Sequence, residues 1–367
     1  MKGIVVVLLC AIGIVYGCTP SVTRVSGTVA PSSYCSGDII FEDNFNSINF
    51  TNWFFENTLA GGGNWEFQWY PGHDYANLYA ENGLLKFAPT FTADRYGEAF
   101  LTSGRVVIPP DQCTQADWYG CERQGTAENI INPIRSTRVD TRRSFGFVYG
   151  ELEIRAKMPA GDWLWPALWL MPQSNVYGGW PRSGEIDLME MRGNRNLFSG
   201  STNVGVEQGG STMHFGPNWN FNGWPTAHHT RNQQPGFNAG FHLYRLVWTP
   251  TEIQFWYDNN HVGTVAGGTG FWDRGNFHNS GFTNPWVNGT VMAPFDQEFY
   301  IIMNLAVGGT NYFSDSFVNV PNPKPWHNDS PTAPRDFWRA RNAWEPTWNR
   351  GTEDSFMQID YVRVRAL

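Results

Sequence analysis

Short runs in which apolar and polar residues alternate recur along the whole chain, and they constrain its fold more than any other feature of the sequence. Residues 151–157 form the clearest run, and residues 361–366 repeat the pattern near the other end. A period of two places alternate side chains on opposite faces of a β-strand, so we expect one face of each run to be buried. Clusters of Gly, Pro and Asn separate the runs, which is typical of strands joined by turns.

The same criteria predict seven further strands, and the sequence contains no long stretch with a helical period. These strands are residues 39–41, 84–87, 100–103, 164–170, 243–249, 252–257 and 299–305. Many short strands without alternating helices indicate an all-β fold, an antiparallel β-sandwich or jelly roll. We predict one domain at residues 39–367, because no repeat or composition break interrupts it, preceded by a Ser-, Thr- and Pro-rich lead-in at residues 18–38.

The first residues indicate the compartment. Lys2 precedes an apolar run at residues 4–16 that is too short to cross a bilayer but has the length of a signal-peptide core. We therefore expect residues 1–17 to be a cleaved signal peptide and the mature protein to be secreted. Two glycosylation sequons, at Asn49 and Asn288, are then available for modification. No later apolar run reaches membrane-spanning length, so we expect a soluble mature protein without a membrane partner. We also expect a monomer.

Four cysteines remain after removal of the predicted signal peptide, and an even number in an oxidising compartment indicates disulfide bonds. Four cysteines allow three pairings. We favour the local one, Cys18 with Cys35 and Cys113 with Cys121, because the two pairs lie in separate turn-rich segments. A zinc site is less favoured, because no Cys-x-x-Cys spacing occurs.

The acidic segment at residues 183–191 is the strongest functional signal in the sequence. Glu185 and Asp187 would share one face of a regular strand, and Glu190 would point to the opposite face. One extra, bulged residue near Leu188 and Met189 would bring all three acids to the same side. Four effective strand steps of ~3.3 Å and two inward-leaning side chains then leave ~5 Å between the two Glu carboxyls, the separation typical of retaining glycosidases.

Two other interpretations of this segment compete with catalysis. The acids could form a solvated strand face, although like charges gathered on one face repel each other and disfavour a purely structural role. They could also form a calcium site, although their spacing does not follow an EF-hand loop.

The run from Glu185 to Glu190 resembles the active-site signature of glycoside hydrolase family 16. Its form with two residues before the last Glu is similar to that of laminarinases and of invertebrate β-1,3-glucan recognition proteins. Residues 61–69, 132–136, 159–166 and 304–310 resemble the same group, so the similarity extends along nearly the whole mature chain. The resemblance implies a concanavalin A-like jelly roll with a glucan cleft on its concave face, and retaining hydrolysis of internal linkages.

The resemblance also implies roles for the three acids, with Glu185 as nucleophile, Glu190 as acid/base and Asp187 as the residue that orients and tunes the nucleophile. Chemistry supports this division independently, because cleaving an acetal needs one carboxylate to attack and one carboxylic acid to protonate the leaving oxygen. The negative charge of Asp187 would help to keep Glu190 protonated. This reaction requires no cofactor and no metal, and a structural calcium ion near Asp360 is left open.

A carbohydrate ligand also suits the composition. The formal net charge is −8 and no run of Lys or Arg occurs, so a nucleic-acid partner would lack its main electrostatic attraction. The 18 Trp residues exceed what a core requires, and flat aromatic faces suit the apolar faces of pyranose rings. We assign Trp169 to the core. The resemblance implies six substrate-binding residues, namely Asn64, Arg138, Tyr149, Trp163, Trp165 and His214, although a structural role for His214 is an equal alternative.

Two functions of different classes fit these features. The first is a secreted endo-β-1,3-glucanase with a digestive or defensive role. The second is a pattern-recognition protein of innate immunity that binds β-1,3-glucan without cutting it. We favour the enzyme, because such recognition proteins commonly carry an additional N-terminal glucan-binding module and lack one or both catalytic Glu residues. Residues 18–38 are too few for such a module, and all three acids are present.

Overall fold

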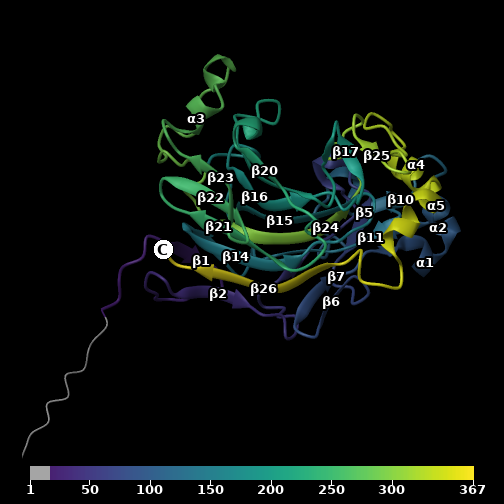
Figure 1. The fold of residues 1–367 in the computed structure, drawn as a ribbon, viewed down its shortest axis with the longest axis horizontal. Coiled ribbons are helices and arrows are strands. Elements are labelled where there is room, and N and C mark those ends of the chain that lie inside the picture. Colours follow the sequence, from purple (N-terminus) through teal and green to yellow (C-terminus); the bar gives the residue numbers. More distant parts are fainter. Residues whose placement is uncertain (1–16) are drawn as a thin grey trace, which may run out of the picture.

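The alternating runs form the strands of two large antiparallel sheets. The computed structural model describes residues 17–367, so the predicted signal peptide lies almost entirely outside the described residues. Figure 1 shows the two sheets stacked on each other, with most of the short helices gathered at one end. In strand β14 (Gly150–Lys157) every second residue is buried, which confirms the prediction from alternation.

The first large sheet forms one layer of the sandwich and has eight strands. Its order is β23 (Asn260–Ala266), β22 (Glu252–Tyr257), β21 (His242–Trp248), β14, β26 (Met357–Arg365), β7 (Leu84–Phe87) and β6 (Leu78–Glu81), with β2 (Ile39–Asp43) paired to β26. Its outward face carries ion pairs between neighbouring strands, such as Arg245 with Glu151 and Arg363 with Glu42. Charged side chains therefore line the face of the sheet that is turned to solvent, and the apolar face packs inward.

The second large sheet has nine strands and carries the acidic segment. Its order is β1 (Arg24–Ser26), β13 (Gly146–Val148), β24 (Phe299–Val307), β15 (Leu164–Pro172), β16 (Glu185–Met191), β19 (Gln208–His214) and β20 (His228–Asn232), with β12 (Arg138–Asp140) on β24 and β3 (Phe54–Phe55) on β12. Figure 1 shows this sheet curving, so that α3 rises beyond one end of its outer face and β17 and β25 rise beyond the other. The outer face is therefore the concave face.

Short elements surround the two large sheets. The small strands are β4 (Asn57–Thr58), β5 (Gln68–Pro71), β8 (Thr90–Phe91), β9 (Arg105–Val107), β10 (Glu122–Gln124), β11 (Ile134–Arg135), β17 (Leu197–Ser199), β18 (Thr202–Asn203) and β25 (Val318–Asn319). The helices are α1 (Thr92–Tyr96), α2 (Glu98–Ser103), α3 (Phe271–Arg274), α4 (Ala333–Arg339) and α5 (Arg341–Trp344), with 3-10 turns η1 (Gly62–Asn64), η2 (Asp117–Tyr119), η3 (Trp224–Thr226), η4 (Phe277–Asn279) and η5 (Glu345–Trp348). Within residues 17–367, no helix has the length and apolar character needed to span a membrane.

The hydrophobic core lies between the two large sheets. Ile154 of β14 and Phe255 of β22 face it from one sheet, and Leu168 of β15 and Ile186 of β16 face it from the other. All four side chains are fully buried. Burying an aliphatic or aromatic side chain of this size stabilises the fold by roughly 1.5–3 kcal/mol, so this interior sets the positions of the strands.

Most predicted strands are confirmed, and one is wrong. Residues 100–103 lie in helix α2 rather than in a strand. Gly97 turns the chain with a φ of 85° before the helix, and only Leu101 of the helix is buried. The ring of Phe100 stacks on Tyr96, while the hydroxyl of Ser103 donates to the carbonyl of Ala99. Contacts within one turn thus outweigh the apolar character that suggested a strand.

The predicted lead-in contributes to the fold. Strand β1 lies within it and pairs with β13 at the edge of the nine-stranded sheet. The hydroxyl of Tyr34 donates to the carbonyl of Thr23, which closes the segment on itself. Residues 24–26 therefore extend the sheet that carries the acidic strand.

Both predicted disulfides are present, and the predicted sequons are exposed. Cys18 is bonded to Cys35, and Cys113 is bonded to Cys121. The side chains of Asn49 and Asn288 are accessible to solvent, which permits modification at both positions. Glycosylation of these two residues stays a prediction.

We expect the Cys113–Cys121 bond to stabilise its loop more than the whole fold. The two residues are only 8 apart, and closing so short a loop contributes about 2–3 kcal/mol in the chain-entropy account. Replacing both residues with Ser should lower the melting temperature by less than about 10 °C. Differential scanning calorimetry tests this, with mass spectrometry of the unreduced protein as a check of the pairing. Loss of the cooperative transition in the double variant would contradict it.

Candidate active site

Strand β16 contains the bulge that the acidic segment predicts. On β19, Asp187 pairs with Thr212 and Glu190 pairs with Gly210, so three steps on β16 match two steps on β19. The pairing of β16 with β15 shifts at the same place. One extra residue therefore lies between Asp187 and Glu190.

The pairing with β15 identifies the extra residue. Leu168 pairs with Met189 and the next residue, Trp169, pairs with Asp187, which leaves Leu188 without a counterpart. The carbonyl of Leu188 accepts hydrogen bonds from the hydroxyls of Ser211, at 2.7 Å, and Tyr257, at 3.2 Å. A buried carbonyl without a partner would cost about 1–3 kcal/mol, so these two hydroxyls stabilise the bulge from the core side.

The bulge places the three acids on the concave face of the nine-stranded sheet. Glu185 and Glu190 are half-buried, and Asp187 between them is only 2% exposed. Ile186 and Met191 are fully buried and point toward the core. The segment therefore presents its carboxyl groups on one side and its apolar side chains on the other.

Glu190 has the properties of a proton donor. Burial, reinforced by the negative charge of Glu185, raises the pKa of Glu190 to about 7. The indole Nε1 of Trp165 donates a hydrogen bond to Glu190 Oε1 at 2.9 Å, which opposes that rise by stabilising the carboxylate. At neutral pH the carboxyl is therefore protonated in a substantial fraction of molecules.

Trp165 is held in place by its neighbours. Its ring stacks on Tyr312 with the centroids 4.1 Å apart and the planes at 5°. The guanidinium of Arg192 lies 3.9 Å from the centroid of the Tyr312 ring and donates to the Tyr312 carbonyl. Trp165 is only 8% exposed, so it positions Glu190 rather than offering a ring face to a ligand.

Glu185 has a different neighbour. The indole Nε1 of Trp180 donates to Glu185 Oε2 at 2.5 Å. Trp180 is 44% exposed and belongs to the loop that leads into β16. Sequence reasoning missed this residue, and its place five residues before Glu185 was the only available signal.

Asp187 contacts a histidine on the adjacent strand. His214 Nε2 lies 3.3 Å from Asp187 Oδ2, and His214 pairs with Glu185 across the two strands. Burial, together with the charges of Glu185 and Glu190, raises the pKa of Asp187 well above its ordinary value. Burial alone would lower the pKa of His214, but its contact with Asp187 and the charges of the acids raise it to about 9.

Neither of the two places considered for calcium, the acidic segment and Asp360, offers the ligand atoms of a calcium site. Among the described residues, Glu185, Asp187 and His214 bring potential ligand atoms within 4.8 Å of one another. One of these donors is a nitrogen, whereas Ca²⁺ takes oxygen ligands. On the opposite sheet, Asp360 forms an ion pair with Arg155, so a cation already neutralises this carboxylate.

Other polar and aromatic side chains share the concave face with the acids. Trp169 pairs with Asp187 and is half-buried, with its Nε1 donating to Asn304 Oδ1 at 2.7 Å. Its assignment to the core is therefore wrong. The guanidinium of Arg138 lies 5.2 Å from the centroid of the Trp169 ring and 5.0 Å from that of Tyr70. The structure thus places Arg138 on this face, and its contact with a substrate stays a prediction.

Asn64 lies on a glycine-rich loop beside the end of β24. Its carbonyl accepts the backbone N–H of Thr310 at 2.7 Å, and its Oδ1 accepts from the amide of Asn311 at 3.0 Å. The Asn64 side chain is half-buried. The structure therefore ties this loop to the segment that follows the central strand of the sheet.

Three of the predicted substrate-binding residues, Trp163, Tyr149 and the Trp165 described above, are buried, and those predictions are wrong. Trp163 is 1% exposed and packs edge-on against Phe313 and Trp326. It precedes β15 with a φ of 70°, which breaks the alternation that would have placed it on the same face as Trp165. Tyr149 is 6% exposed and packs edge-on against Trp248 in the core.

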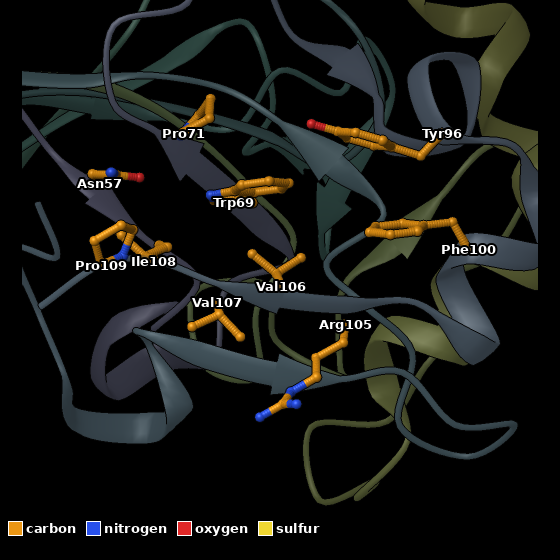
Figure 2. A pocket seen from close by; sticks show the side chains of 10 residues that line it. All are labelled: Asn57, Trp69, Pro71, Tyr96, Phe100, Arg105, Val106, Val107, Ile108 and Pro109. Carbon is orange, nitrogen blue, oxygen red and sulfur yellow. The ribbon is translucent and has the colours of Figure 1, made fainter.

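A separate hollow lies on the other face of β5. Figure 2 shows side chains of α1, α2, β5 and β9 around it, and its volume is about 400 Å³. Tyr70 of β5 contacts Arg138 on the concave face, whereas its neighbour Trp69 lines this hollow, because successive residues of a strand point to opposite sides. The hollow is therefore distinct from the site of the three acids.

Comparison with known proteins agrees with this fold. The family model described as "Glycosyl hydrolases family 16" matches residues 122–271, which include all three acids. Solved structures with the same fold include the laminarinase from Rhodothermus marinus and the endo-β-1,3-glucanase from Pyrococcus furiosus. Each is 22% identical with a TM-score of 0.56, and the alignments cover 90% of this chain and 98% and 95% of those chains.

Two curated relatives are more similar in sequence. A "Beta-1,3-glucan-binding protein" from Penaeus monodon is 45% identical over 339 residues, which is 89% of each chain. A "Beta-1,3-glucan-binding protein 1" from Galleria mellonella is 35% identical over 96% of this chain and 68% of its own length. The chain therefore belongs to glycosyl hydrolase family 16, in the group that contains the β-1,3-glucan-binding proteins.

Proposed function

We propose that the protein is a secreted retaining endo-hydrolase of β-1,3-glucan. The observation that carries this proposal is the bulge in β16, which puts Glu185 and Glu190 on one face in different surroundings. Glu190 has a pKa raised to about 7, whereas Glu185 accepts a hydrogen bond from an exposed indole. Two carboxyl groups with separate tasks are what retaining hydrolysis needs.

The reaction divides between these two groups. Glu190 gives its proton to the glycosidic oxygen while Glu185 attacks the anomeric carbon, so the bond to the leaving sugar breaks as a glycosyl ester forms. Glu190, now a carboxylate, then takes a proton from water. That water attacks the anomeric carbon and frees Glu185, which restores both side chains.

The neighbours of the acids fit these tasks. The Trp180 indole holds one oxygen of Glu185, which leaves the other oxygen free to attack. Asp187 lies next to Glu185 on the same face and carries a raised pKa, which favours one shared negative charge on these two acids over the lasting negative charge on Asp187 predicted from the sequence. Trp165 fixes the direction of the Glu190 carboxyl.

A second candidate is a recognition protein that binds β-1,3-glucan without cutting it. The names of the curated relatives from Penaeus monodon and Galleria mellonella support it, because both are called glucan-binding proteins. The same concave face, with Arg138 and Trp169, would then act as the binding surface. Secretion, which both candidates require, is supported by the two disulfide bonds.

We predict that the unaltered protein releases reducing sugar from laminarin and that Glu185→Gln lowers this activity about 10³-fold or more. The amide keeps the shape of the side chain but cannot attack the anomeric carbon. Binding to insoluble curdlan should stay within about twofold in this variant. Turnover near that of the unaltered protein would contradict the role of Glu185, and tight curdlan binding without any release by the unaltered protein would favour the recognition protein.

The hydrogen bond from the Trp165 indole to Glu190 leads to a prediction about the pH dependence of activity. The activity should fall as pH rises through the pKa of Glu190, about 7, because the proton donor is lost. Trp165→Phe removes a hydrogen bond that stabilises the carboxylate while keeping a ring on Tyr312, so the alkaline limb of kcat/KM should move to higher pH. Initial rates on laminarin between pH 4 and 10 give this limb. A limb that stays in place or moves to lower pH would show that the bond does not tune Glu190.

A further prediction concerns the anomer that hydrolysis releases first. A nucleophile and an acid on one face at ~5 Å require a covalent intermediate, so the β-anomer should appear first. Proton NMR of early laminarin digestion distinguishes the two anomers. Initial release of the α-anomer would mean inversion and a wider gap between the carboxyl groups.

A further inference from the structure

A buried asparagine on β24 links two aromatic rings of the concave face. Asn304 is only 3% exposed. Its Oδ1 accepts the indole N–H of Trp169 on β15 at 2.7 Å, and its Nδ2 donates to the hydroxyl of Tyr70 on β5 at 3.3 Å. An indole N–H can only donate, so Oδ1 must face Trp169 and the NH₂ group must face Tyr70. One amide therefore ties a ring of the nine-stranded sheet to a ring of the small sheet that contains β5.

The guanidinium of Arg138 lies over both of these rings. Its carbon atom is 5.0 Å from the centroid of Tyr70 and 5.2 Å from that of Trp169. A cation is attracted to the face of an aromatic ring at such distances. Arg138 also pairs directly with Asn304 across β12 and β24, so the amide lies next to the base of the arginine side chain. The two linked rings therefore form the surface on which the guanidinium rests.

The ion pair of Arg138 is too long to fix the direction of its guanidinium. Glu66 Oε2 lies 3.8 Å from a terminal nitrogen of Arg138, which is longer than a hydrogen bond, and it accepts from the Gln68 amide at 2.7 Å. Within residues 17–367, Arg138 Nε has no hydrogen-bond partner. The direction of the guanidinium therefore depends mainly on the two ring faces, while the side chain, 22% exposed, still reaches solvent.

Arg138 lies on the concave face at a distance from the acids. Strands β24 and β15 separate β12 from β16, and three strand spacings of ~4.8 Å put the two backbones ~14 Å apart. A guanidinium offers several N–H donors, which suit the hydroxyls of a sugar. This spacing fits a sugar unit farther along the chain than the unit that Glu185 would attack.

We propose that Asn304 is a positioning residue that, through the rings of Trp169 and Tyr70, directs the Arg138 guanidinium at a sugar unit beyond the point of cleavage. The inference rests on the proposed function and deepens it, because it identifies the substrate as a chain of several sugar units. A short oligosaccharide bound at the acids would not reach Arg138. Asn304 is too buried to contact the sugar itself.

A double-mutant cycle on laminarin binding tests this role. Each protein carries Glu185→Gln, so that the ligand is not hydrolysed, and isothermal titration calorimetry gives the Kd. We expect Arg138→Ala to weaken binding about 10-fold and Asn304→Ala to weaken it about fivefold. Combined with Arg138→Ala, the Asn304 substitution should add less than about 1.5-fold, because no guanidinium remains to be positioned.

Two further variants separate positioning from folding. Tyr70→Phe keeps the ring under Arg138 and removes only the hydroxyl, so it should weaken binding about two- to threefold, again only while Arg138 is present. This variant decides the question if Asn304→Ala does not fold. The matched control is Asn77→Ala, which removes a fully buried amide that bonds to the carbonyls of Ala88 and Arg135. Its laminarin Kd should stay within about twofold.

Equal losses from Asn304→Ala with and without Arg138 would overturn the proposal, because a purely structural role acts in both backgrounds. Unchanged binding in Arg138→Ala would overturn it as well. With Glu185 restored, Asn304→Ala should raise KM for laminarin and leave kcat within about twofold. If the protein with Glu185 releases no reducing sugar while the binding cycle shows the expected pattern, hydrolysis is refuted and the positioning role stands.

Discussion

The whole site depends on one extra residue in one strand. Leu188 has no counterpart on β15, and its presence turns Glu190 onto the face already occupied by Glu185. In a regular strand with this sequence, Glu190 would point toward the apolar interior, where a carboxyl group without partners is costly. The hydroxyls of Ser211 and Tyr257 stabilise the bulge from the core side. The core of the sandwich and the chemistry of its concave face are therefore linked through a single carbonyl group.

Three acids on one face would all be ionised at neutral pH, and would repel each other, if their surroundings were like water. The neighbouring strands and loops make them different, because each acid contacts a different partner. Trp180 donates to Glu185, Trp165 donates to Glu190, and His214 lies beside the buried Asp187. Burial favours the protonated form of those acids whose negative charge is stabilised least by neighbouring donors and cations. The acids therefore differ in protonation and can carry out separate tasks.

Local pattern was sufficient to predict much of the fold and the main feature of the site. The alternation in β14, the local disulfides and the bulge in β16 depend on residues close together in the chain, so the sequence contains the information needed. The predictions are wrong where a contact between distant residues, or an unusual backbone angle, determines the direction of a side chain. Trp163 turns into the core because of its positive φ. Trp169 reaches the concave face because it pairs with Asp187.

Membership of family 16 leaves two uses for the same concave face, cutting a β-1,3-glucan or holding it. If the bulge builds a nucleophile and a proton donor, as we propose, hydrolysis must pass through a covalent intermediate on Glu185. Reaction with a 2-deoxy-2-fluoro laminaribiosyl fluoride, which slows the release of such an intermediate, tests this central claim directly by peptide mass spectrometry. We expect one added disaccharide on the peptide that contains Glu185. A label on Glu190 instead, or no label on a preparation that binds curdlan, would contradict the claim.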